Sequence, residues 1–199
     1  MAEAPDQLKQ RIRREVREQR AGRSSAEQLR ARSTLTQHLA ALVTEVGARS
    51  VSCYLPIAGE PDTSEFVAWA QTHGIEVLLP SAREDGELHW ARASDAGTAP
   101  GAFGIPEPLG ERLDPTAVSD VDLMLIPACA VDRSGVRLGW GRGYFDRSLG
   151  AMRLRPPVFA VLYEAELRDT LPREPHDVPV AGVVTPAGVV HFDQAGSHD

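Results

Sequence analysis

Three glycines stand at every second position of the segment RLGWGRGYFD, as Gly139, Gly141 and Gly143. Glycine loses more conformational entropy on folding than any other residue, so this repeated use predicts a main chain that adopts positive φ or that another group approaches closely. Backbone amides that point inward from such a loop, ahead of a helix, form a nest for phosphate oxygens. The loop is therefore a candidate phosphate site.

Charged residues near these glycines fit the same chemistry. Arg133, Arg137, Arg142 and Arg147 flank the loop in the sequence, and the planar arginine fork suits phosphate or carboxylate better than lysine does. Asp146 falls in the first turn of the helix that should follow, where the helix dipole favours a carboxylate that can hold a nucleotide-bound Mg²⁺ ion. The alternative is a glycine-rich surface turn with solvated arginines, because the spacing matches neither the dinucleotide fingerprint nor the Walker pattern.

The apolar run VDLMLIPACAV directly precedes the loop and predicts a central, buried strand. Open parallel sheets bind ligands beyond the carboxyl ends of their strands, and residues 127–143 occupy that place. Upstream, SVSCYL and IEVLLP are typical of strands, and the short helix between them should open near Asp62 and Glu65 and stop at Gly74. This order favours neighbouring parallel strands with helices on the faces of the sheet.

The rest of the chain continues an α/β pattern. ELHWARA, VFAVLY, GVVT and GVVHF are further candidate strands, YFDRSLGAM begins a helix, and residues 93–115 predict a long surface loop rich in glycine and proline. No second shift in composition marks a domain boundary. We therefore expect an α/β fold, a single three-layer domain with a central mostly parallel or mixed sheet flanked by helices.

The N-terminal part carries a charge opposite to that of the rest of the chain. Residues 9–32 contain nine Lys or Arg against three Glu, although the whole chain has a net charge of −7. A nucleic-acid-binding module is one interpretation of this basic arm. Leu8, Ile12 and Val16 recur at four-residue spacing, however, which predicts a helix that docks on an apolar surface.

A second helix is predicted after the basic arm. Ser24 and Glu27 have the spacing of a capping box, in which each residue satisfies a backbone N–H of the other. Apolar residues then recur on one helical face, at Leu35, Leu39, Leu42, Val43 and Val46.

Composition and spacing exclude several classes of protein. No run approaches the roughly 18 apolar residues of a membrane span, and the first residues lack the apolar region of a secretory signal. Cys53 and Cys129 each stand in an apolar run, which predicts two buried thiols rather than a disulfide. The six histidines are scattered without zinc-site spacing, so any metal would have oxygen ligands. We expect a cytoplasmic protein.

The segment VDRSGVRLGWGRGYFDRSL resembles the signature FD-x-x-G-x-RLG-x-G-x-GYYD of the 5-formyltetrahydrofolate cyclo-ligase family, also called 5,10-methenyltetrahydrofolate synthetases. Further segments are similar to the family in the same order along the chain, namely KQRIR, CYLPIAGEPDT, GIPEP and PHDVPV. The resemblance extends over most of the chain. It implies the family's three-layer fold as one domain over residues 1–199, with flexible ends at residues 1–8 and 194–199.

The resemblance also implies an activity. Members of the family convert 5-formyltetrahydrofolate and MgATP to 5,10-methenyltetrahydrofolate, ADP and phosphate. A formamide oxygen is a poor leaving group, so ring closure by N10 requires that this oxygen first becomes a phosphate ester. The expected ligands are ATP, Mg²⁺ and a folate with or without a polyglutamate tail. We expect a monomer with no nucleic-acid or membrane partner.

The resemblance implies roles for residues at matching positions. ATP would be bound by Lys9, Arg13, Arg137, Leu138, Gly139, Trp140, Gly141, Arg142, Gly143, Tyr144 and Phe145. The folate would be bound by Leu55, Glu60, Trp140 and Tyr144. Asp146 and Asp177 would ligate Mg²⁺, and Arg137, Arg142 and Tyr144 would act in catalysis.

Four positions depart from the family pattern. Phe145 replaces a common tyrosine and so lacks its hydroxyl, and Trp140 and Arg142 stand where other residues are usual. Ala181 stands where an acid is frequent after the late His-Asp pair, which weakens the assignment of further carboxylates around the metal. Phosphate contacts made by the backbone would survive all four changes.

Other interpretations stay open at this point. Lys9 and Arg13 would also fit a solvated basic face, Glu60 a turn before Pro61, and Asp177 a turn residue. For the whole protein, one alternative is a sugar-phosphate isomerase or CoA-transferase-like enzyme, which would use the loop for phosphate without ATP. A second alternative is a nucleic-acid-binding module that uses the basic N-terminal helix.

Overall fold

The computed structural model describes residues 4–83, 86–94, 97–101, 106–174 and 177–193. Helices and short 3₁₀ turns, labelled η, alternate with strands along the chain. In order, the elements are α1 (Pro5–Ala21), α2 (Ser25–Val46), β1 (Ser50–Ser52), α3 (Ser64–Thr72), β2 (Glu76–Ala82), β3 (Leu88–Arg92), β4 (Thr98–Pro100), β5 (Pro106–Pro108), β6 (Arg112–Leu113), η2 (Pro115–Asp120), β7 (Leu123–Pro127), β8 (Ala130–Asp132), β9 (Arg137–Leu138), α4 (Tyr144–Ala151), β10 (Val158–Val161), η3 (Glu164–Glu166), β11 (Leu167–Arg168), β12 (Gly182–Thr185) and β13 (Gly188–His191).

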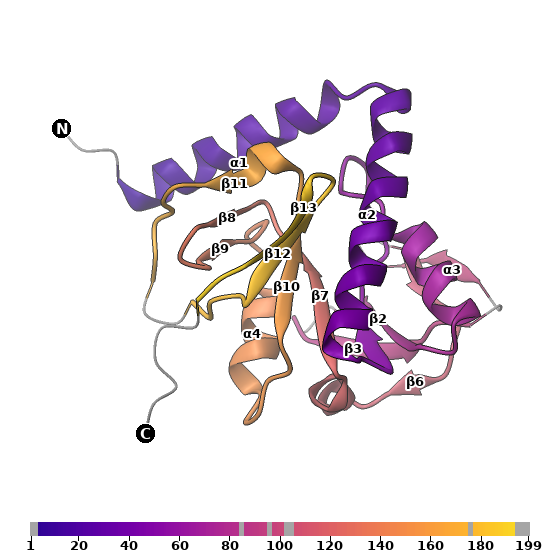
Figure 1. Cartoon of the computed structure of the whole chain (residues 1–199). Helices are drawn as coiled ribbons and strands as arrows, with labels where there is room; N and C mark the ends of the chain where they lie inside the picture. Colours follow the sequence, from indigo (N-terminus) through magenta and orange to yellow (C-terminus); the bar gives the residue numbers. More distant parts are fainter. Residues whose placement is uncertain (1–3, 84–85, 95–96, 102–105, 175–176, 194–199) are drawn as a thin grey trace.

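The central sheet is mixed and mostly parallel. Within the described residues it contains eight strands in the order β13-β12-β10-β7-β1-β2-β3-β6. The inner strands from β12 to β2 run parallel to one another. At the edges, β13 pairs antiparallel with β12, β3 pairs antiparallel with β2, and β6 pairs antiparallel with β3. Helices α2 and α3 lie on one side of the sheet and α4 on the other (Figure 1). The predicted three-layer α/β fold is confirmed.

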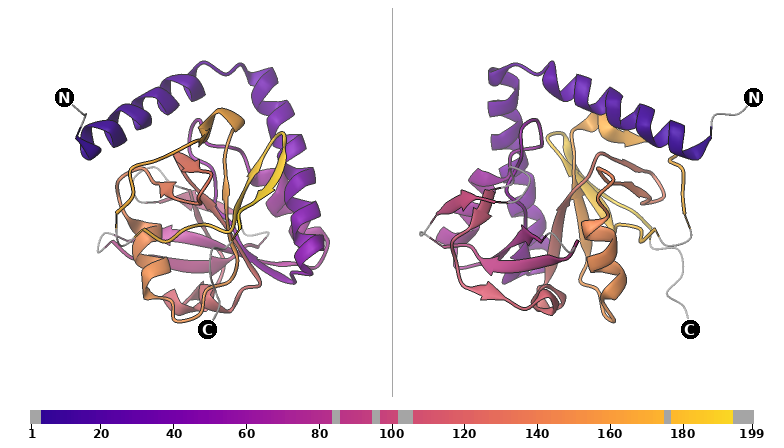
Figure 2. Two further views of the ribbon diagram at one scale, coloured as in Figure 1. Left: turned by 60° about the vertical axis from the view of Figure 1, so that its left-hand side comes forward. Right: turned by 180° about the vertical axis from the view of Figure 1, so that it is seen from behind.

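The direction in which the chain adds strands reverses between β1 and β7. From β1 the chain passes through α3 to β2 on one side, and from β7 it passes through α4 to β10 on the other side. Helices α3 and α4 therefore cover opposite faces of the sheet, as the two views in Figure 2 show. In an open parallel sheet, such a reversal leaves a crevice for ligands beyond the carboxyl ends of the two strands.

The position of β7 explains its continuous apolar sequence. Leu123 and Leu125 pack on the side of α2 and α3, whereas Met124 and Ile126 pack on the side of α4. All four side chains are buried, because β7 lies in the middle of a sheet that helices cover on both faces. The predicted central strand is confirmed for Leu123–Pro127, whereas the end of the same apolar run, from Ala130, forms β8 of a separate three-stranded sheet.

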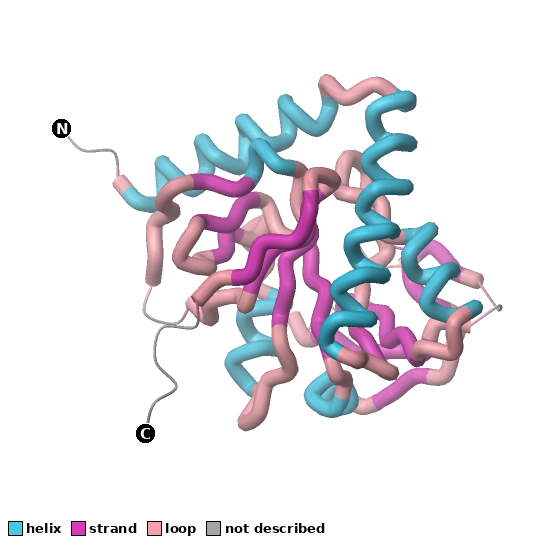
Figure 3. Tube along the Cα trace, viewed as in Figure 1, coloured by secondary structure: helices cyan, strands magenta, loops and turns pink. Residues whose placement is uncertain are grey.

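Helix α1 lies on a second, smaller sheet formed by β11, β8 and β9. Ile12 and Val16 are buried against this sheet, where Leu138 and Leu171 meet them, and Leu8 packs at the edge of the same cluster. In Figure 3, α1 runs along the top of the molecule, apart from the helices that cover the central sheet. The predicted docking of the basic arm is confirmed, and it fixes α1 beside the start of the glycine loop.

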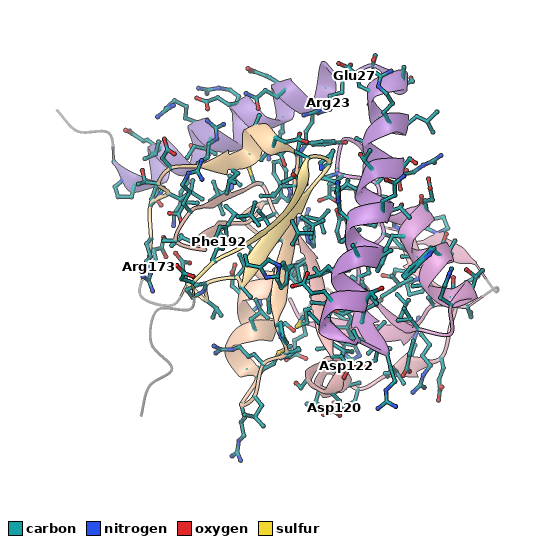
Figure 4. All side chains as sticks on the ribbon, viewed as in Figure 1. Arg23, Glu27, Asp120, Asp122, Arg173 and Phe192 are labelled. Atoms are coloured by element: carbon teal, nitrogen blue, oxygen red, sulfur yellow. The ribbon has the colours of Figure 1, made fainter. Side chains whose placement is uncertain are left out.

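Helix α2 begins with the predicted capping box. The Ser24 hydroxyl accepts a hydrogen bond from the Glu27 N–H at 3.3 Å, and the Glu27 carboxylate accepts one from the Ser24 N–H at 2.8 Å. Figure 4 labels Glu27 and Arg23 where the chain turns from α1 into α2. The predicted apolar face is buried except for Val46, which is 40% exposed. Val46 is the last residue of the helix, before Gly47 ends it with φ 65°.

Two predicted elements differ in extent from those in the structure. Strand β1 covers only the first three residues of SVSCYL, and the following residues lead into the loop before α3. Residues 93–115, expected to form one long loop, contain β4, β5 and β6. Strands β4 and β5 pair with each other, and β6 extends the central sheet. These strands are too short for a periodic pattern to predict them.

Both cysteines are free and buried, as expected. Burial raises the pKa of the Cys53 thiol and of the Cys129 thiol to about 12. Both thiols are therefore protonated at neutral pH, and neither has the character of a nucleophile.

The ends of the chain and two short motifs are described only in part. Helix α1 begins at Pro5, so residues 5–8 are helical, and the flexibility expected for residues 1–8 and 194–199 stays a prediction. Residues 1–3 and 194–199 lie outside the described residues, as do Gly104 and Ile105 of GIPEP and His176 of PHDVPV. In the part of the chain that the structure describes, no helix is long and apolar enough to cross a membrane.

Candidate active site

A cavity of about 230 Å³ lies in the crevice beyond the carboxyl ends of β1 and β7. The loop after β1, the end of β7, the glycine loop and the start of α4 all contribute to its wall. Ten of the predicted site residues line it: Leu55, Glu60, Arg137, Gly139, Trp140, Arg142, Gly143, Tyr144, Phe145 and Asp146. The fold thus brings the expected folate residues and most of the expected phosphate residues into one space.

At each of the three loop glycines, the structure shows why a residue with a side chain is disfavoured. Gly141 has φ 93° and Gly143 has φ 68°, a conformation that side chains disfavour, and Gly143 is the N-cap of α4. Gly139 has no positive φ, but a Cβ atom at this position would lie 3.1 Å from the Arg137 guanidinium. The expectation of positive φ or close approach is therefore confirmed, by conformation at two positions and by crowding at the third.

Of the two basic residues expected to bind phosphate from α1, Arg13 contacts the glycine loop and Lys9 contacts the segment before β12. The Arg13 Nε atom donates a hydrogen bond to the Gly139 carbonyl oxygen at 2.9 Å, and the Arg13 guanidinium lies within 4 Å of where a Cβ at Gly141 would be. Lys9 forms an ion pair with Glu174, and its side chain is 14% exposed. A fully solvated basic face is excluded for both residues. Neither one lines the cavity itself, but Arg13 places positive charge on the α1 side of the loop.

Arg137 is buried behind the loop and pairs with Asp146. Burial lowers the pKa of Arg137, while the charges of Asp146 and Asp177 act in the opposite direction. Of the two carboxylates expected to ligate a metal, Asp146 at the start of α4 pairs with this guanidinium, and Asp177 in the segment before β12 acts on it through its charge. Asp177 also accepts a hydrogen bond from the Glu174 N–H at 2.7 Å, so it has a turn role as well.

The carboxylates around Arg137 fit only one kind of metal site. Among the residues that the structure describes, no group of three or more His, Cys, Asp or Glu side chains could hold a metal ion. Asp146 is 35% exposed toward the cavity it lines. Magnesium is commonly held by one or two carboxylates together with waters and phosphate oxygens. Asp146 therefore fits a Mg²⁺ ion shared with a nucleotide and not a metal enclosed by protein alone, whereas Asp177 does not line the cavity.

Glu60 is a partly buried carboxylate on the wall formed by the loop after β1. Burial raises its pKa, while the hydrogen bond that it accepts from the Ile57 N–H at 3.2 Å and the charge of Arg20 lower it in part. Leu55, in the same loop, adds apolar surface to the cavity. A desolvated carboxylate in such a place suits a ligand that presents paired N–H donors.

Trp140 lies against two arginines of α1. The centroid of its ring is 5.3 Å from the Arg17 guanidinium and 5.0 Å from the Arg20 guanidinium. Its indole N–H is near enough to Glu60 to lower the pKa of that carboxylate, yet it has no hydrogen-bond partner of ordinary geometry within the described residues. A buried donor of this kind on a cavity wall is available to a ligand acceptor.

Tyr144 and Phe145 line the cavity at the first turn of α4. The Tyr144 hydroxyl donates a hydrogen bond to the Arg83 carbonyl oxygen at 2.9 Å, so it is already engaged by the main chain. Phe145 offers only its ring. A catalytic role for Tyr144 stays a prediction, since its hydroxyl would have to leave this partner.

Three residues of the loop region have roles that the sequence did not indicate. Leu138 is buried beneath α1, so that only its backbone can contact a ligand. Arg133 forms an exposed ion pair and does not line the cavity. Arg147 donates hydrogen bonds at 2.8 Å to the carbonyl oxygens of Arg142 and Gly86, which ties the loop to the turn between β2 and β3.

Sequence reasoning missed Arg20, which is buried where α1 meets the site. It forms a bidentate ion pair with Glu166 and lies over Trp140. A signal was available, because Arg20 continues the four-residue spacing of Ile12 and Val16. A charged residue on a buried helical face requires a buried partner.

The fold and the cavity together define an α/β enzyme whose ligand crevice lies at the switch point of a mostly parallel sheet. The model of the 5-formyltetrahydrofolate cyclo-ligase family matches residues 5–186. The chain therefore belongs to the 5-formyltetrahydrofolate cyclo-ligase family, and the resemblance noted in its sequence is confirmed.

Individual relatives agree with this assignment. The 5-formyltetrahydrofolate cyclo-ligase of Mycolicibacterium smegmatis is 37% identical over 147 residues, which cover 71% of this chain and 76% of that protein. The cyclo-ligase of Haemophilus influenzae is 29% identical over 184 residues, covering 89% and 97%. The solved structure of Aquifex aeolicus 5,10-methenyltetrahydrofolate synthetase has a TM-score of 0.80 and 34% identity, and the match covers 96% of both chains.

Proposed function

We propose that the protein cyclises 5-formyltetrahydrofolate to 5,10-methenyltetrahydrofolate, driven by MgATP, with release of ADP and phosphate. One observation carries the proposal: a single cavity joins Leu55 and Glu60, expected to bind the folate, to Arg137 and Asp146, expected on the phosphate side. Phosphoryl transfer requires donor and acceptor to be held together in one space. Membership of the cyclo-ligase family supports the same activity.

The reaction takes two steps. The formyl oxygen on N5 attacks the γ-phosphorus of ATP, so that a new O–P bond forms, ADP leaves, and N5 shares the positive charge as an iminium. N10 then attacks the formyl carbon and loses its proton. Cleavage of the C–O bond releases inorganic phosphate and leaves the methenyl bridge. Catalysis of such a transfer is mostly positioning and stabilisation of charge.

The glycine loop and its arginines would perform the phosphate part of this task. Backbone N–H groups from Gly139 to Gly143 would contact the triphosphate, and Arg137 and Arg142 would stabilise the charge on the transferred phosphoryl group. Lys9 and Arg13 would add positive charge from α1. Because Lys9 already pairs with Glu174, nucleotide binding would exchange that partner for a phosphate oxygen.

Asp146 and Asp177 would hold Mg²⁺ between the loop and the nucleotide. When bound, the ion would neutralise charge on the phosphates. Asp146 pairs with Arg137 in the structure, so this carboxylate would be shared between the guanidinium and the metal. The ion pair with the buried arginine would orient the carboxylate for a metal ion.

The folate would occupy the part of the cavity near Glu60. The aminopyrimidine edge of a pterin offers paired N–H donors, which match one carboxylate. Leu55, Trp140 and Tyr144 would pack on the ring system. The buried indole N–H of Trp140 would find an acceptor on the ligand.

The other expectations stay predictions. These are a monomeric state, a cytoplasmic location, the acceptance of polyglutamate tails and the absence of a nucleic-acid partner. Against nucleic acid as the main ligand of the basic arm, Lys9, Arg13 and Arg20 all contact groups within this chain.

The test is to mix the protein with MgATP and 5-formyltetrahydrofolate and to follow the absorbance of the methenyl product together with released ADP. The proposal expects one ADP for each methenyl group formed and no product without either ATP or Mg²⁺. Product formation without nucleotide, or ADP release that does not depend on the folate, would contradict it.

A further inference from the structure

Arg20 of α1 is held by a set of contacts that the proposed chemistry does not use. Its side chain is 5% exposed. It donates hydrogen bonds to the two carboxylate oxygens of Glu166 at 2.7 and 2.8 Å and to the Ala128 carbonyl oxygen at 2.9 Å. Glu166 in turn accepts a hydrogen bond from the Tyr163 N–H at 3.0 Å. A fork held at three acceptors has a fixed orientation, which a single lysine ammonium would not provide.

The stem of Arg20 supports the loop that carries Glu60. Gly59 precedes Glu60 and has φ 85°, and a Cβ atom at Gly59 would lie 3.4 Å from the Cβ and 3.9 Å from the Cδ of Arg20. The loop backbone therefore lies directly on the aliphatic part of the arginine. The contact involves the residue directly before Glu60, so Arg20 lies where it can support the backbone that carries the Glu60 carboxylate.

The guanidinium of Arg20 supports Trp140. It lies 5.0 Å from the centroid of the indole ring, at the distance of a cation–π contact. The chain neighbours of Trp140 are Gly139 and Gly141, which have no side chains to pack against the ring. The groups that face the ring therefore decide where it lies.

Glu60 and Trp140 also form a partition between two spaces. Both line the cavity of the candidate site, and both line a second cavity of about 510 Å³ that Arg17 and Arg20 border. Side chains with open space on two sides receive less support from the core than ordinary wall residues do. Arg20 is a buried group that contacts Trp140 of this partition and Gly59, the residue directly before Glu60.

We propose that Arg20 is a positioning residue for the folate side of the site, which sets the separation of Glu60 and Trp140 without touching the substrate. The inference rests on the proposed function, since that function assigns these two residues to the folate. Arg20 makes its contacts with Glu166, Ala128, the Gly59 loop and Trp140, and Arg137 and Asp146 have their own ion pair. Its loss should therefore affect folate binding and leave nucleotide binding nearly unchanged.

The test uses the double variant Arg20→Met and Glu166→Met. Replacing both partners removes the ion pair without leaving a buried charge unpaired, which a single replacement would do. We expect the Kd and the KM for 5-formyltetrahydrofolate to rise by about tenfold or more, because small displacements of binding groups have effects of this size. We expect kcat at saturation and the KM for MgATP to change by less than about twofold. Titration calorimetry gives the Kd independently of turnover.

A matched control separates this role from a general effect of charge. Arg17 faces the same ring at 5.3 Å but is exposed, whereas Arg20 is buried and bonded to Glu166 and Ala128. Arg17→Met should change the folate Kd by less than about twofold. An equal effect of Arg17→Met and the double variant would overturn the proposal.

A second variant keeps the ion pair intact. Gly59→Ala adds a Cβ atom at positive φ against the stem of Arg20, so it should displace the Glu60 loop and weaken folate binding selectively. If circular dichroism shows that the double variant is unfolded, Gly59→Ala tests the positioning role instead. Unchanged folate affinity in a folded variant, or equal losses for folate and MgATP, contradicts a positioning role. A wild-type protein that binds no 5-formyltetrahydrofolate contradicts the proposed function instead.

Discussion

Arg13 of α1 donates a hydrogen bond of 2.9 Å to the carbonyl oxygen of Gly139, a residue 126 positions further along the chain. The contact joins the basic N-terminal helix to the glycine loop and depends on the burial of Ile12 and Val16 against the small sheet beneath α1. The charge of α1 thus reaches the candidate phosphate site through tertiary packing, and not through proximity in sequence.

Arg13→Gln should raise the KM for MgATP by about tenfold or more, because a charge-assisted hydrogen bond contributes about 1.5–3 kcal/mol and each 1.4 kcal/mol is a factor of ten. The KM for the folate should stay within about twofold. Arg14 is exposed on the same helix, so Arg14→Gln is the matched control. Steady-state kinetics with each substrate varied in turn makes the measurement, and similar values for both variants would contradict the assignment.

Asp146→Asn should lower kcat/KM by about a hundredfold or more and raise the Mg²⁺ concentration required for half-maximal rate, because an amide is a weaker ligand for this cation. The variant also leaves buried Arg137 without its partner, which by itself would lower only stability. Titrating Mg²⁺ at fixed ATP separates the two effects. Asp169, whose side chain is 92% exposed, supplies the control Asp169→Asn. An unchanged Mg²⁺ requirement in Asp146→Asn would argue against metal ligation.

Arg137→Ala should reduce turnover by about a hundredfold or more through loss of charge stabilisation in the transition state. The fold should persist, because the carboxylate left behind on Asp146 has access to water. Circular dichroism checks the fold and single-turnover product formation checks the chemical step. A folded variant with the wild-type rate would remove Arg137 from the mechanism.

Gly143→Ala should destabilise the protein by about 1–2 kcal/mol, the usual cost of a left-handed conformation for a residue with a side chain. The added Cβ atom would also lie 2.9 Å from the Arg147 guanidinium. A Cβ atom added at Gly150, in helix α4, would meet no described atom within 4 Å, so Gly150→Ala should stabilise by about 0.5–1 kcal/mol. Urea unfolding measures the free energy of unfolding of both variants, which should fall in Gly143→Ala and rise in Gly150→Ala. Activity should fall only in Gly143→Ala.

Glu60→Gln should stabilise the protein at neutral pH and weaken folate binding. Burial raises the pKa of Glu60 in the folded state above its ordinary value of 4.5, so the folded state binds this proton more tightly than the unfolded state does. Wild-type stability from this group is therefore greatest below pH 4.5 and falls as pH rises through the folded pKa. Replacement by glutamine removes that loss.

The difference in thermal midpoint between Glu60→Gln and wild type should thus be positive at neutral pH and vanish below the ordinary carboxyl pKa. The exposed Glu18 provides the control Glu18→Gln, which should leave the thermal midpoint at neutral pH nearly unchanged. A gain in stability that persists in acid would mean that the buried charge is not its cause.

Much of the fold could be predicted because its largest elements have clear periodic patterns. The apolar run of β7 indicates a strand covered on both faces, and the capping box at Ser24 marks the start of α2. Strands β4, β5 and β6 could not be predicted, because two or three residues carry no measurable periodicity. Val46 was predicted on the buried face of α2 but is exposed, because it is the last residue of the helix and the periodic pattern does not fix where a helix ends.

Some residues of the candidate site could be predicted from the sequence and others could not. The glycine loop and Asp146 were predictable, because positive φ and a helix start depend on neighbouring residues alone. The position of Arg133, which pairs on the surface, was not predictable. The burial of Arg20 was missed, although its four-residue spacing from Ile12 and Val16 places it on the buried face of α1.

By itself, the sequence determined the local conformations, the alternation of strands and helices, and the chemistry available in the loop, because each of these follows from residues close together in the chain. The tertiary structure alone decided that the loop after β1 and the loop after β7 share a cavity, and that α1 brings Arg13 and Arg20 to it. The physical reason is that the order of strands in the sheet and the burial of distant apolar faces set these contacts. Neither the strand order nor the contacts between distant apolar faces can be read from a short-range sequence pattern.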